Sequence, residues 1–374
     1  MKKGVSRSVR TAADALHRYN SVKKFRAWRT EMIGFVINHQ FFQAFADYLL
    51  KFGYANQTPV CAVSMQNLKK CFGGSPLFAD IWNGGTLEKD VQIEIPTFLD
   101  SGGNVFSEKN AEYFDAGFLN WLHDQTTVLT QKSLAKESLA HALLSCDLSL
   151  YAIPTWHVST FSELLNRMQA INRGFLKPIS GRKGLGTCKI WSDNRHFTIR
   201  NIDGTFKLTE EWFLTYLARN EKDGLGSSVL LQPCLDFSLD ESHAIDFRLL
   251  RHRGKNGVWE EVATYARIGA TNLVSNVSQG GFIGDPRETL SVIAGDQADS
   301  LFDEIMFLGE AIPKLIQRFR GDSVFCLGLD VAVDRSTLRP YILEANTYPG
   351  TKYFTCQLAE KRVQYYQYLL EQQQ

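Results

Sequence analysis

The chain has 374 residues, of which 44% are hydrophobic and 22% charged, and its formal net charge is +1. This balance is typical of a globular protein of two or three domains, without an overall field that would favour a nucleic acid or a membrane surface as partner. No apolar run approaches the roughly 20 residues that a membrane helix needs. The seven cysteines are scattered without a CxxC pair, which favours reduced thiols in the cytoplasm over a disulfide framework or a zinc site.

The first 30 residues differ from the rest of the chain. They contain nine Lys or Arg residues and a single acid, Asp14, and their apolar residues recur at helical spacing. This pattern predicts a basic, amphipathic helical arm over residues 1–30. A transit peptide and an arm that binds an anionic partner share this pattern. We expect instead a solvated helix that packs on the body of the protein.

From residue 32 the pattern becomes α/β. A short apolar strand over 32–38 precedes a helix over 39–53, in which Gly53 takes the position that follows a helix C-terminus. Residues 58–74 repeat the order of strand and helix, and 91–103 predict a third strand and its loop. This alternation predicts a parallel sheet with covering helices. Because no glycine fingerprint follows the first strand, a dinucleotide-binding fold is not expected.

Residues 111–150 are predicted to be helical, with Lys136 near the start of one helix. An apolar strand then delivers Lys177 to a glycine-rich loop that contains Gly181, Gly184 and Gly186. Glycines let backbone N–H groups approach an anion closely, and a lysine supplies a point charge. A second strand follows the loop, so this is not a Walker loop, and an ordinary hairpin turn is the alternative.

Three strands toward the C-terminus carry charged residues among apolar ones. Asp246 and Arg248 lie two apart on one strand, where they form either part of a site or a structural ion pair, and Arg267 lies on the next strand. Asp330 lies within the apolar stretch VFCLGLDVAVD, where a carboxylate needs an ion pair or a metal.

The stretch PYILEANTYPG, residues 340–350, ends a strand with Glu344 and Asn346 on one face. If this strand pairs with the strand of Asp330 as a hairpin, the three side chains converge. Hard oxygen ligands on two strands suit Mg²⁺, with nucleotide phosphates completing its shell. The alternative is a strand end with a polar turn.

The ordered set of these features resembles the ATP-grasp fold. Lys136 and Lys177 are followed in order by LLQPCL, IDFR, ARIG, NVSQGG, GLD and LEANTYPG. The spacing is most similar to the YheC/YheD-like, endospore coat-associated subgroup. The resemblance implies an α/β chain, α+β in its ATP-grasp part. It implies the arm over 1–30, a pre-ATP-grasp α/β domain over 31–127 and a two-lobed ATP-grasp domain over 128–374, with the small ATP-covering lobe over about 150–235.

The resemblance also assigns residues to ATP and to two Mg²⁺ ions. Lys136 and Lys177 would contact the phosphates, beneath a flap that contains Gly184 and Gly186. Gln232 and Leu235 would contact the adenine edge, and Asp240, through a looser match, would bind the ribose. The metal ligands are Asp330, Glu344 and Asn346.

Catalytic roles beside the γ-phosphate and the carboxylate substrate fall to Arg248 and Arg267, together with Lys177. Many ATP-grasp ligases carry an arginine two residues before the first metal-binding aspartate, but this chain has Gly328 there. The resemblance therefore implies that Arg267 or Arg248 stabilises the developing charge.

The family activates a carboxylate as an acyl phosphate, which an amine then attacks. We expect an ADP-forming, cytoplasmic ligase that joins a small-molecule or peptide carboxylate to an amine, with no membrane or nucleic-acid partner. The alternatives are an ATP-grasp kinase and a nucleotide-binding structural or coat-associated protein with little turnover. The oligomeric state is left open.

Overall fold

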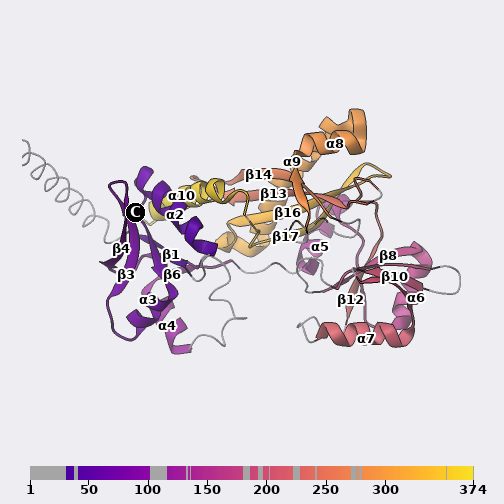
Figure 1. Cartoon of the computed structure of the whole chain (residues 1–374), viewed down its shortest axis with the longest axis horizontal. Helices are drawn as coiled ribbons and strands as arrows, with labels where there is room; N and C mark the ends of the chain where they lie inside the picture. The colour runs from indigo at the N-terminus through magenta and orange to yellow at the C-terminus, as the bar shows by residue number, and fades with distance from the viewer. Residues whose placement is uncertain are drawn as a thin grey trace, which may run out of the picture.

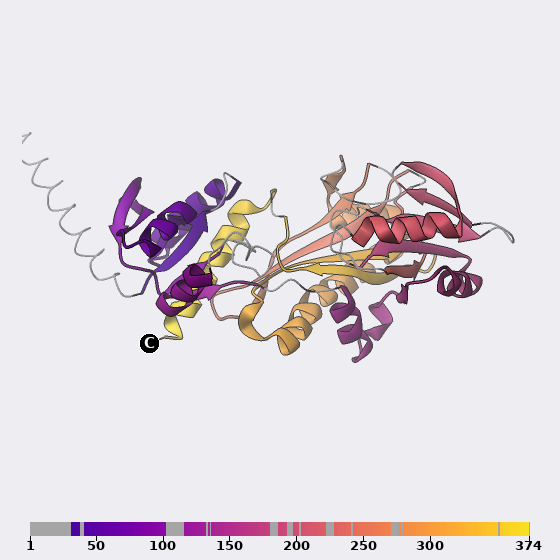
Figure 2. The same cartoon turned by 90° about the horizontal axis from the view of Figure 1, so that it is seen from below.

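The structure, a computed structural model, describes most of the chain from residue 31 to residue 373. It leaves out 38–40, 102–115, 132–133, 135, 180–185, 193–196, 202, 222–227, 241, 271–274, 276, 278–279 and 351. The predicted arm over residues 1–30 lies outside the described residues. Within them, three sheets follow one another along the chain, and they are arranged along the long axis of the molecule (Figures 1 and 2).

The first sheet has the strand order β4-β3-β2-β1-β5-β6. Its elements are β1 (Ile33–Ile37), α2 (Phe41–Ala55), β2 (Val60–Ser64), α3 (Met65–Phe72), β3 (Leu77–Asn83), β4 (Thr86–Ile93), β5 (Phe98–Asp100), α4 (Ala116–Gln125) and β6 (Thr127–Leu129). Strands β1, β2, β5 and β6 are parallel, as predicted, but β3 runs antiparallel to both of its neighbours, β2 and β4. The prediction of a parallel sheet was wrong at this edge, where Gly84 and Gly85 adopt positive φ angles of 57° and 90° and close a tight hairpin between β3 and β4.

Two further predictions for this region need correction. Gly53 does not follow the end of its helix, because α2 continues to Ala55. A Cβ at Gly53 would lie 2.8 Å from Cγ2 of Val60, so the glycine allows the helix to approach β2 closely. The stretch 111–150 is not wholly helical, because the strand β6 separates α4 from α5 (Lys136–Leu144).

The second sheet has the order β11-β10-β9-β8-β12-β7. Its elements are β7 (Trp156–Val158), α6 (Phe161–Ile171), β8 (Arg173–Pro178), β9 (Cys188–Ser192), β10 (Phe197–Asn201), β11 (Gly204–Leu208), α7 (Glu210–Glu221) and β12 (Val229–Pro233). Strands β8 and β9 pair antiparallel, as the predicted strand-loop-strand pattern requires. One core joins the sheet to α6 and α7 through Leu164, Met168 and Phe213.

The third sheet lies in the middle of the molecule and is antiparallel throughout, with the order β15-β14-β13-β16-β17. Its elements are β13 (Ile245–Arg253), β14 (Trp259–Ile268), β15 (Phe282–Gly284), α8 (Pro286–Ala294), α9 (Ala298–Arg320), β16 (Cys326–Asp334), β17 (Arg339–Asn346) and α10 (Thr355–Glu371). Phe247, Leu329 and Ile342 share a core with Ile305 and Ile312 of α9. This face is therefore wholly structural, and polar site residues can occupy only the other face.

Helix α10 joins the central sheet to the first sheet. Its residues Val363 and Tyr366 share a core with Leu250 of β13 and with Phe35 and Leu49 of the N-terminal region. Figure 1 shows α10 and α2 side by side, although they lie at opposite ends of the chain. The core thus crosses the boundary predicted near residue 127.

A buried arginine compensates for a proline inside α9. Pro313 has no N–H, so it cannot donate to the carbonyl of Gly309 four residues earlier. Nε of Arg251, which is buried, donates to that carbonyl at 3.2 Å. A Cβ at Gly309 would lie 2.5 Å from Nη2 of Arg251, so the glycine also makes room for the guanidinium.

We expect this compensation to appear as a coupling free energy between the two positions. In an Arg251→Met background the Gly309 carbonyl loses its donor, and Pro313→Ala would restore a helical N–H to it. Pro313→Ala should therefore stabilise that background by about 1 kcal/mol more than it stabilises the wild type. Urea unfolding of the four proteins measures this difference. Equal effects of Pro313→Ala in both backgrounds would contradict it.

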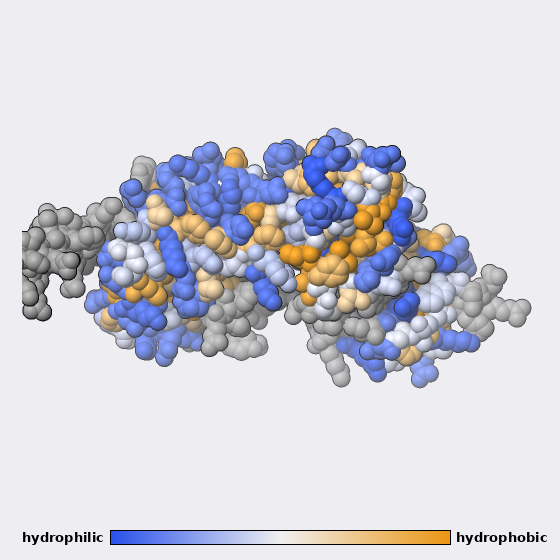
Figure 3. Space-filling model, turned by 45° about the horizontal axis from the view of Figure 1, so that its top comes forward, coloured by the Kyte–Doolittle hydropathy of each residue, from blue (hydrophilic) through white to orange (hydrophobic). Residues whose placement is uncertain are grey.

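The face of the molecule drawn in Figure 3 is mainly hydrophilic. In the view of Figure 3, apolar residues gather in a band near the middle of the molecule, and hydrophilic residues cover most of the rest. Among the described residues, no helix combines the length and the apolar character that crossing a membrane requires.

Candidate functional site

The polar face of the central sheet brings together the residues predicted to bind metal. Strands β16 and β17 pair antiparallel, with Asp330 opposite Glu344 and Gly328 opposite Asn346. The predicted hairpin is therefore present. Residues directly opposite each other on one face have Cβ atoms about 5 Å apart, so the side chains of this pair are neighbours.

A β-bulge next to Asp330 sets which way Glu344 points. The register shifts between Asp330 and Val331, so that Val331 faces Ile342 and Leu343 is the additional residue. Ile342 and Ala345 consequently both enter the core against α9, although they lie three residues apart. The extra residue reverses the alternation of faces and turns Glu344 away from that core.

Two arginines enclose Asp330. Nε and Nη2 of Arg248 both donate to its carboxylate, the second at 3.0 Å, and Nη2 of Arg267 lies 2.7 Å from its Oδ2. Arg267 also donates to both oxygens of Asp246, from Nε at 2.6 Å and from Nη2 at 2.5 Å. Ser275 donates to Oδ2 of Asp246 at 2.5 Å. The result is a chain of alternating charges across three strands.

The predicted alternative of a structural pair between Asp246 and Arg248 was wrong. Each residue pairs with the one directly opposite it on the adjacent strand, Asp246 with Arg267 and Arg248 with Asp330. Directly opposed side chains are closer than residues two apart on one strand. Both arginines thus converge on Asp330, which is only 2% exposed.

The charges in this cluster compensate for burial. Burial alone would raise the pKa of Asp330, but the neighbouring Arg248 and Arg267 guanidinium groups outweigh it and lower the pKa to about 2. Burial acts to lower the pKa of Arg267, but Asp246 and Asp330 raise it well above its ordinary value. Asp330 and Arg267 therefore remain ionised at neutral pH.

Gly328 leaves the space through which Arg248 passes. A Cβ at position 328 would lie 3.1 Å from Nη1 and 3.2 Å from Cδ of Arg248, and 2.6 Å from Cβ of Pro349. A side chain at this position would therefore clash with Pro349 and push the Arg248 side chain from its observed place. The cation beside Asp330 comes from the adjacent strand instead of from two residues earlier on the same strand.

Glu344 and Asn346 complete the donor set, since Nδ2 of Asn346 donates to Oε1 of Glu344 at 2.8 Å. Two carboxylates and one amide oxygen suit Mg²⁺ in chemistry. Among the residues that the structure describes, no group of three or more His, Cys, Asp or Glu side chains could hold a metal ion on its own. An ion here would need nucleotide oxygens or water to complete its shell.

The residues predicted to contact the nucleotide lie mainly in the second sheet. Lys177 lies on β8 opposite Leu230 of β12, with its Nζ 5.7 Å from the ring centroid of Phe175. Gly186 adopts a φ of 73° just before β9, a conformation that favours glycine. Gly181 and Gly184 lie outside the described residues. Lys136 opens α5, but its side chain is not described.

The segment after β12 is tied to the β16–β17 turn. The N–H of Asp236 donates to Oδ1 of Asp334 at 3.1 Å, and the N–H of Arg335 donates to the carbonyl of Asp236 at 2.8 Å. Gln232 and Leu235, the predicted adenine contacts, lie just before this junction. Nε2 of Gln232 donates to Oγ1 of Thr155 at 2.8 Å. The predicted nucleotide segment is therefore anchored to the strands that carry the predicted metal ligands.

Asp240 has a local role in this structure. Its Oδ1 accepts from the N–H groups of Ser242 at 2.7 Å and His243 at 3.0 Å, and the His243 ring lies 2.8 Å away. The backbone N–H of Ser242, the His243 side chain and other local contacts lower the pKa of Asp240. The carboxylate thus closes its own turn, and its predicted ribose contact stays a prediction.

Sequence reasoning did not identify two residues beside this site, Gln131 and Tyr348. Nε2 of Gln131 donates to the carbonyl of Thr347 at 2.6 Å, and the N–H of Gln131 donates to the Tyr348 hydroxyl at 2.7 Å. Tyr348 lies within the motif LEANTYPG, but no residue near Gln131 in the sequence indicates a role for it.

Comparisons with known proteins agree with this architecture. A family model described as YheC/D-like ATP-grasp matches residues 125–373. The endospore coat-associated protein YheD of Bacillus subtilis is 22% identical over an alignment of 215 residues, with 54% of this chain and 45% of that protein covered. The chain thus spans less than half the length of this relative.

Solved structures of similar fold include the D-cycloserine synthetase DcsG. It has a TM-score of 0.51 and 14% identity, with 92% of this chain and 100% of that chain covered. The D-alanyl-alanine synthetase A of Vibrio cholerae has a TM-score of 0.49 and 13% identity, with coverage of 92% and 97%.

The three sheets and the polar face of the central one define an ATP-grasp fold, as the sequence resemblance implied. Within that class, the chain belongs to the YheC/D-like ATP-grasp family, whose model covers its C-terminal two thirds.

Proposed function

We propose that the chain is an ADP-forming ligase that joins a carboxylate to an amine through an acyl phosphate. The observation that carries the proposal is the cluster on the polar face of the central sheet, in which Asp330 and Glu344 are directly opposed and two arginines flank Asp330. Phosphoryl transfer needs fixed cations and metal ligands more than a covalent nucleophile. This cluster supplies both groups from rigid strands.

Each predicted residue has a proposed place in the reaction. Asp330, Glu344 and Asn346 would hold Mg²⁺, which when bound neutralises phosphate charge. Lys136, Lys177 and the loop with Gly184 and Gly186 would hold the phosphates, and Gln232, Leu235 and Asp240 the nucleoside. Arg248 and Arg267 would stabilise the charge that develops on the transferred group. The division into a domain over 31–127 and an ATP-grasp domain over 128–374, with a small lobe over about 150–235, belongs to the same proposal.

The ion pairs of Asp330 affect how nucleotide and Mg²⁺ would bind together. The oxygens of Asp330 accept from Arg248 and Arg267. A phosphate that attracts these arginines would release the carboxylate for the metal. The proposed site therefore fills cooperatively, because nucleotide and Mg²⁺ each make room for the other.

A second candidate is a nucleotide-binding structural protein with little turnover. Two observations support it. The oxygens of Asp330 already accept hydrogen bonds from two arginines, and the name of the relative YheD includes an association with the endospore coat. Both candidates bind ATP, so binding tests the nucleotide site and turnover separates the two functions.

We expect Mg²⁺-ATP to raise the melting temperature, because a ligand at 100 times its Kd stabilises the native state by about 2.7 kcal/mol. Lys177→Ala should lose most of this shift. Lys207→Ala is the matched control, since Lys207 lies on the edge strand β11 of the same sheet. Thermal unfolding with and without millimolar ATP measures both effects. No shift in the wild type would refute the nucleotide site.

A further inference from the structure

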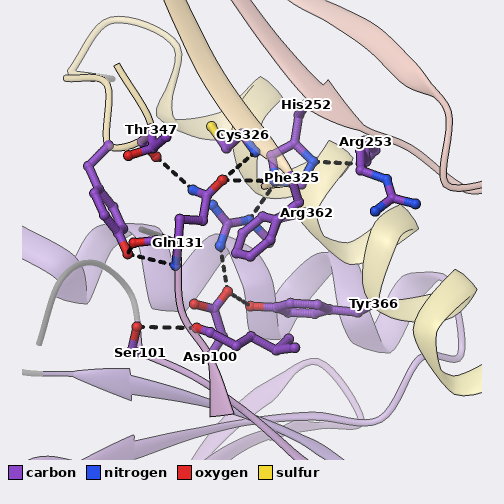
Figure 4. A network of polar contacts seen from close by, with 12 residues as sticks. Asp100, Ser101, Gln131, His252, Arg253, Phe325, Cys326, Thr347, Arg362 and Tyr366 are labelled. Atoms are coloured by element: carbon purple, nitrogen blue, oxygen red, sulfur yellow. Dashed lines mark hydrogen bonds and ion pairs between the residues drawn. The ribbon is translucent and has the colours of Figure 1, made fainter. Parts of the chain in front are cut away.

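A buried polar network fills the junction where the first sheet, the central sheet and α10 meet (Figure 4). Gln131, two residues after β6, lies at its centre and is only 2% exposed. Its side chain lies between the start of β16 and the end of β17, beyond the last paired residues of the two strands, Gly328 and Asn346.

The Gln131 amide continues the ladder where the two strands separate. Its Oε1 accepts from the N–H groups of Phe325 and Cys326, each at 2.8 Å. Its Nε2 donates to the carbonyl of Thr347 at 2.6 Å. One amide therefore satisfies the backbone of both strands, which requires an acceptor and a donor on the same group.

Tyr348 fixes the backbone from which this amide extends. Its hydroxyl accepts from the N–H of Gln131 at 2.7 Å and donates to the carbonyl of the same residue. Burial raises the pKa of Tyr348 to about 12, so the hydroxyl keeps the proton that it donates. Gln131 and Tyr348 thus bind each other through both backbone groups of Gln131, and we call this pair the clamp.

A second branch holds the first sheet against α10. Nη1 of Arg362 donates to Oδ2 of Asp100 at 2.5 Å, and the Tyr366 hydroxyl donates to the same oxygen at 2.6 Å. Nε of Arg362 donates to Nε2 of His252 at 2.6 Å, and Nδ1 of His252 lies 2.6 Å from the carbonyl of Arg253. These partners require a neutral His252 with its proton on Nδ1, in agreement with the lowering of its pKa by burial and by Arg362.

From this geometry we infer that Gln131, held by Tyr348, is a positioning residue for the metal site. Thr347 directly follows Asn346, and the clamp ties it to the start of the strand that carries Asp330. The clamp fixes the end of β17 relative to β16 and with it the separation of Asp330 from Glu344 and Asn346. This inference rests on the proposed function, because it assumes that these side chains bind Mg²⁺ with ATP.

Two variants remove different parts of the clamp. Tyr348→Phe keeps the ring and removes the hydroxyl, whereas Gln131→Met keeps the chain length and removes the amide. Tyr151→Phe is the matched control, because it removes a tyrosine hydroxyl that donates to Glu304 of α9 at 2.9 Å, outside the clamp.

The test measures the Mg²⁺ concentration that gives half of the maximal ATP-dependent rise in melting temperature. We expect this concentration to increase about tenfold in Tyr348→Phe and in Gln131→Met, and to stay unchanged in Tyr151→Phe. Hydrogen exchange in the ligand-free protein provides a second readout. The amides of Phe325 and Cys326 should lose protection in Gln131→Met.

The outcomes separate the inference from the proposed function. A wild type without any Mg²⁺-dependent ATP shift refutes the proposed function, and the positioning role falls with it. A wild type that responds, with an unchanged Mg²⁺ requirement in Tyr348→Phe, overturns the positioning role alone. If Gln131→Met does not fold, Tyr348→Phe and its control still decide the question. A lower melting temperature without a changed Mg²⁺ requirement marks the clamp as merely structural.

Discussion

Glu344→Gln is expected to reduce ATP turnover at least about a hundredfold without lowering the unfolding temperature of the ligand-free protein. The substitution removes one negative charge from the proposed metal site and keeps the shape of the side chain. The oxygen that accepts from Asn346 is retained. Because Asp330 lies directly opposite, a neutral amide also removes the repulsion between two carboxylates.

Glu304→Gln provides the control for this variant. Glu304 is likewise a partly buried carboxylate that accepts one side-chain hydrogen bond, from Tyr151, but it lies on α9 outside the polar face. ATP turnover by the Glu304→Gln protein should equal that of the wild type. An active Glu344→Gln protein would remove Glu344 from the metal site, and an unfolded one would make it a structural residue.

Asp330→Asn is expected to destabilise the protein by roughly 3–5 kcal/mol, because it leaves buried arginines without full compensation. Arg248 loses its carboxylate partner, and Arg267 keeps only Asp246. Asp322→Asn is the control. Asp322 also pairs with a buried arginine, Arg253, at 2.8 Å, but its side chain is 77% exposed, and exposed pairs contribute about 0–1 kcal/mol.

The pH dependence of this difference has a definite sign. The pKa of Asp330 is about 2 in the folded chain, below its ordinary value of 3.8. The unfolded state therefore binds the proton first on acidification, and the ionised group contributes about 2 kcal/mol that is present above pH ~4 and lost as the pH falls through about 2. The difference in unfolding free energy between wild type and Asp330→Asn should shrink from pH 7 to pH 3. A constant or growing difference would contradict the ion-pair account.

Local patterns predicted the parts of the fold that depend on neighbouring residues. The alternation of strands and helices from β1 to α3 and the hairpin with Asp330 and Glu344 were correctly predicted, but β3 was missed and the single strand predicted within 91–103 is divided between β4 and β5. The sequence Asn83-Gly84-Gly85 between β3 and β4 favours a tight turn. The antiparallel β3–β4 hairpin could therefore have been predicted from the sequence.

The features that the sequence did not predict depend on contacts between residues far apart in the chain. The bulge at Leu343 and the pairing of Arg248 with Asp330 depend on strand register, which a single chain pattern does not specify. Gln131 contacts residues more than 190 positions away, so nothing near it in the sequence signals its role. The pattern located the carboxylates and the two arginines, but neither their pairing nor the role of Gln131.

The most direct test of the ligase proposal is ADP release by the purified chain with Mg²⁺-ATP and a pool of amino acids and peptides, with mass spectrometry of the products. We predict that ADP forms in step with a condensed product that lacks one water, and that Glu344→Gln forms neither. ATP binding without ADP release or condensed product under any substrate pool would contradict the ligase and leave the structural nucleotide binder.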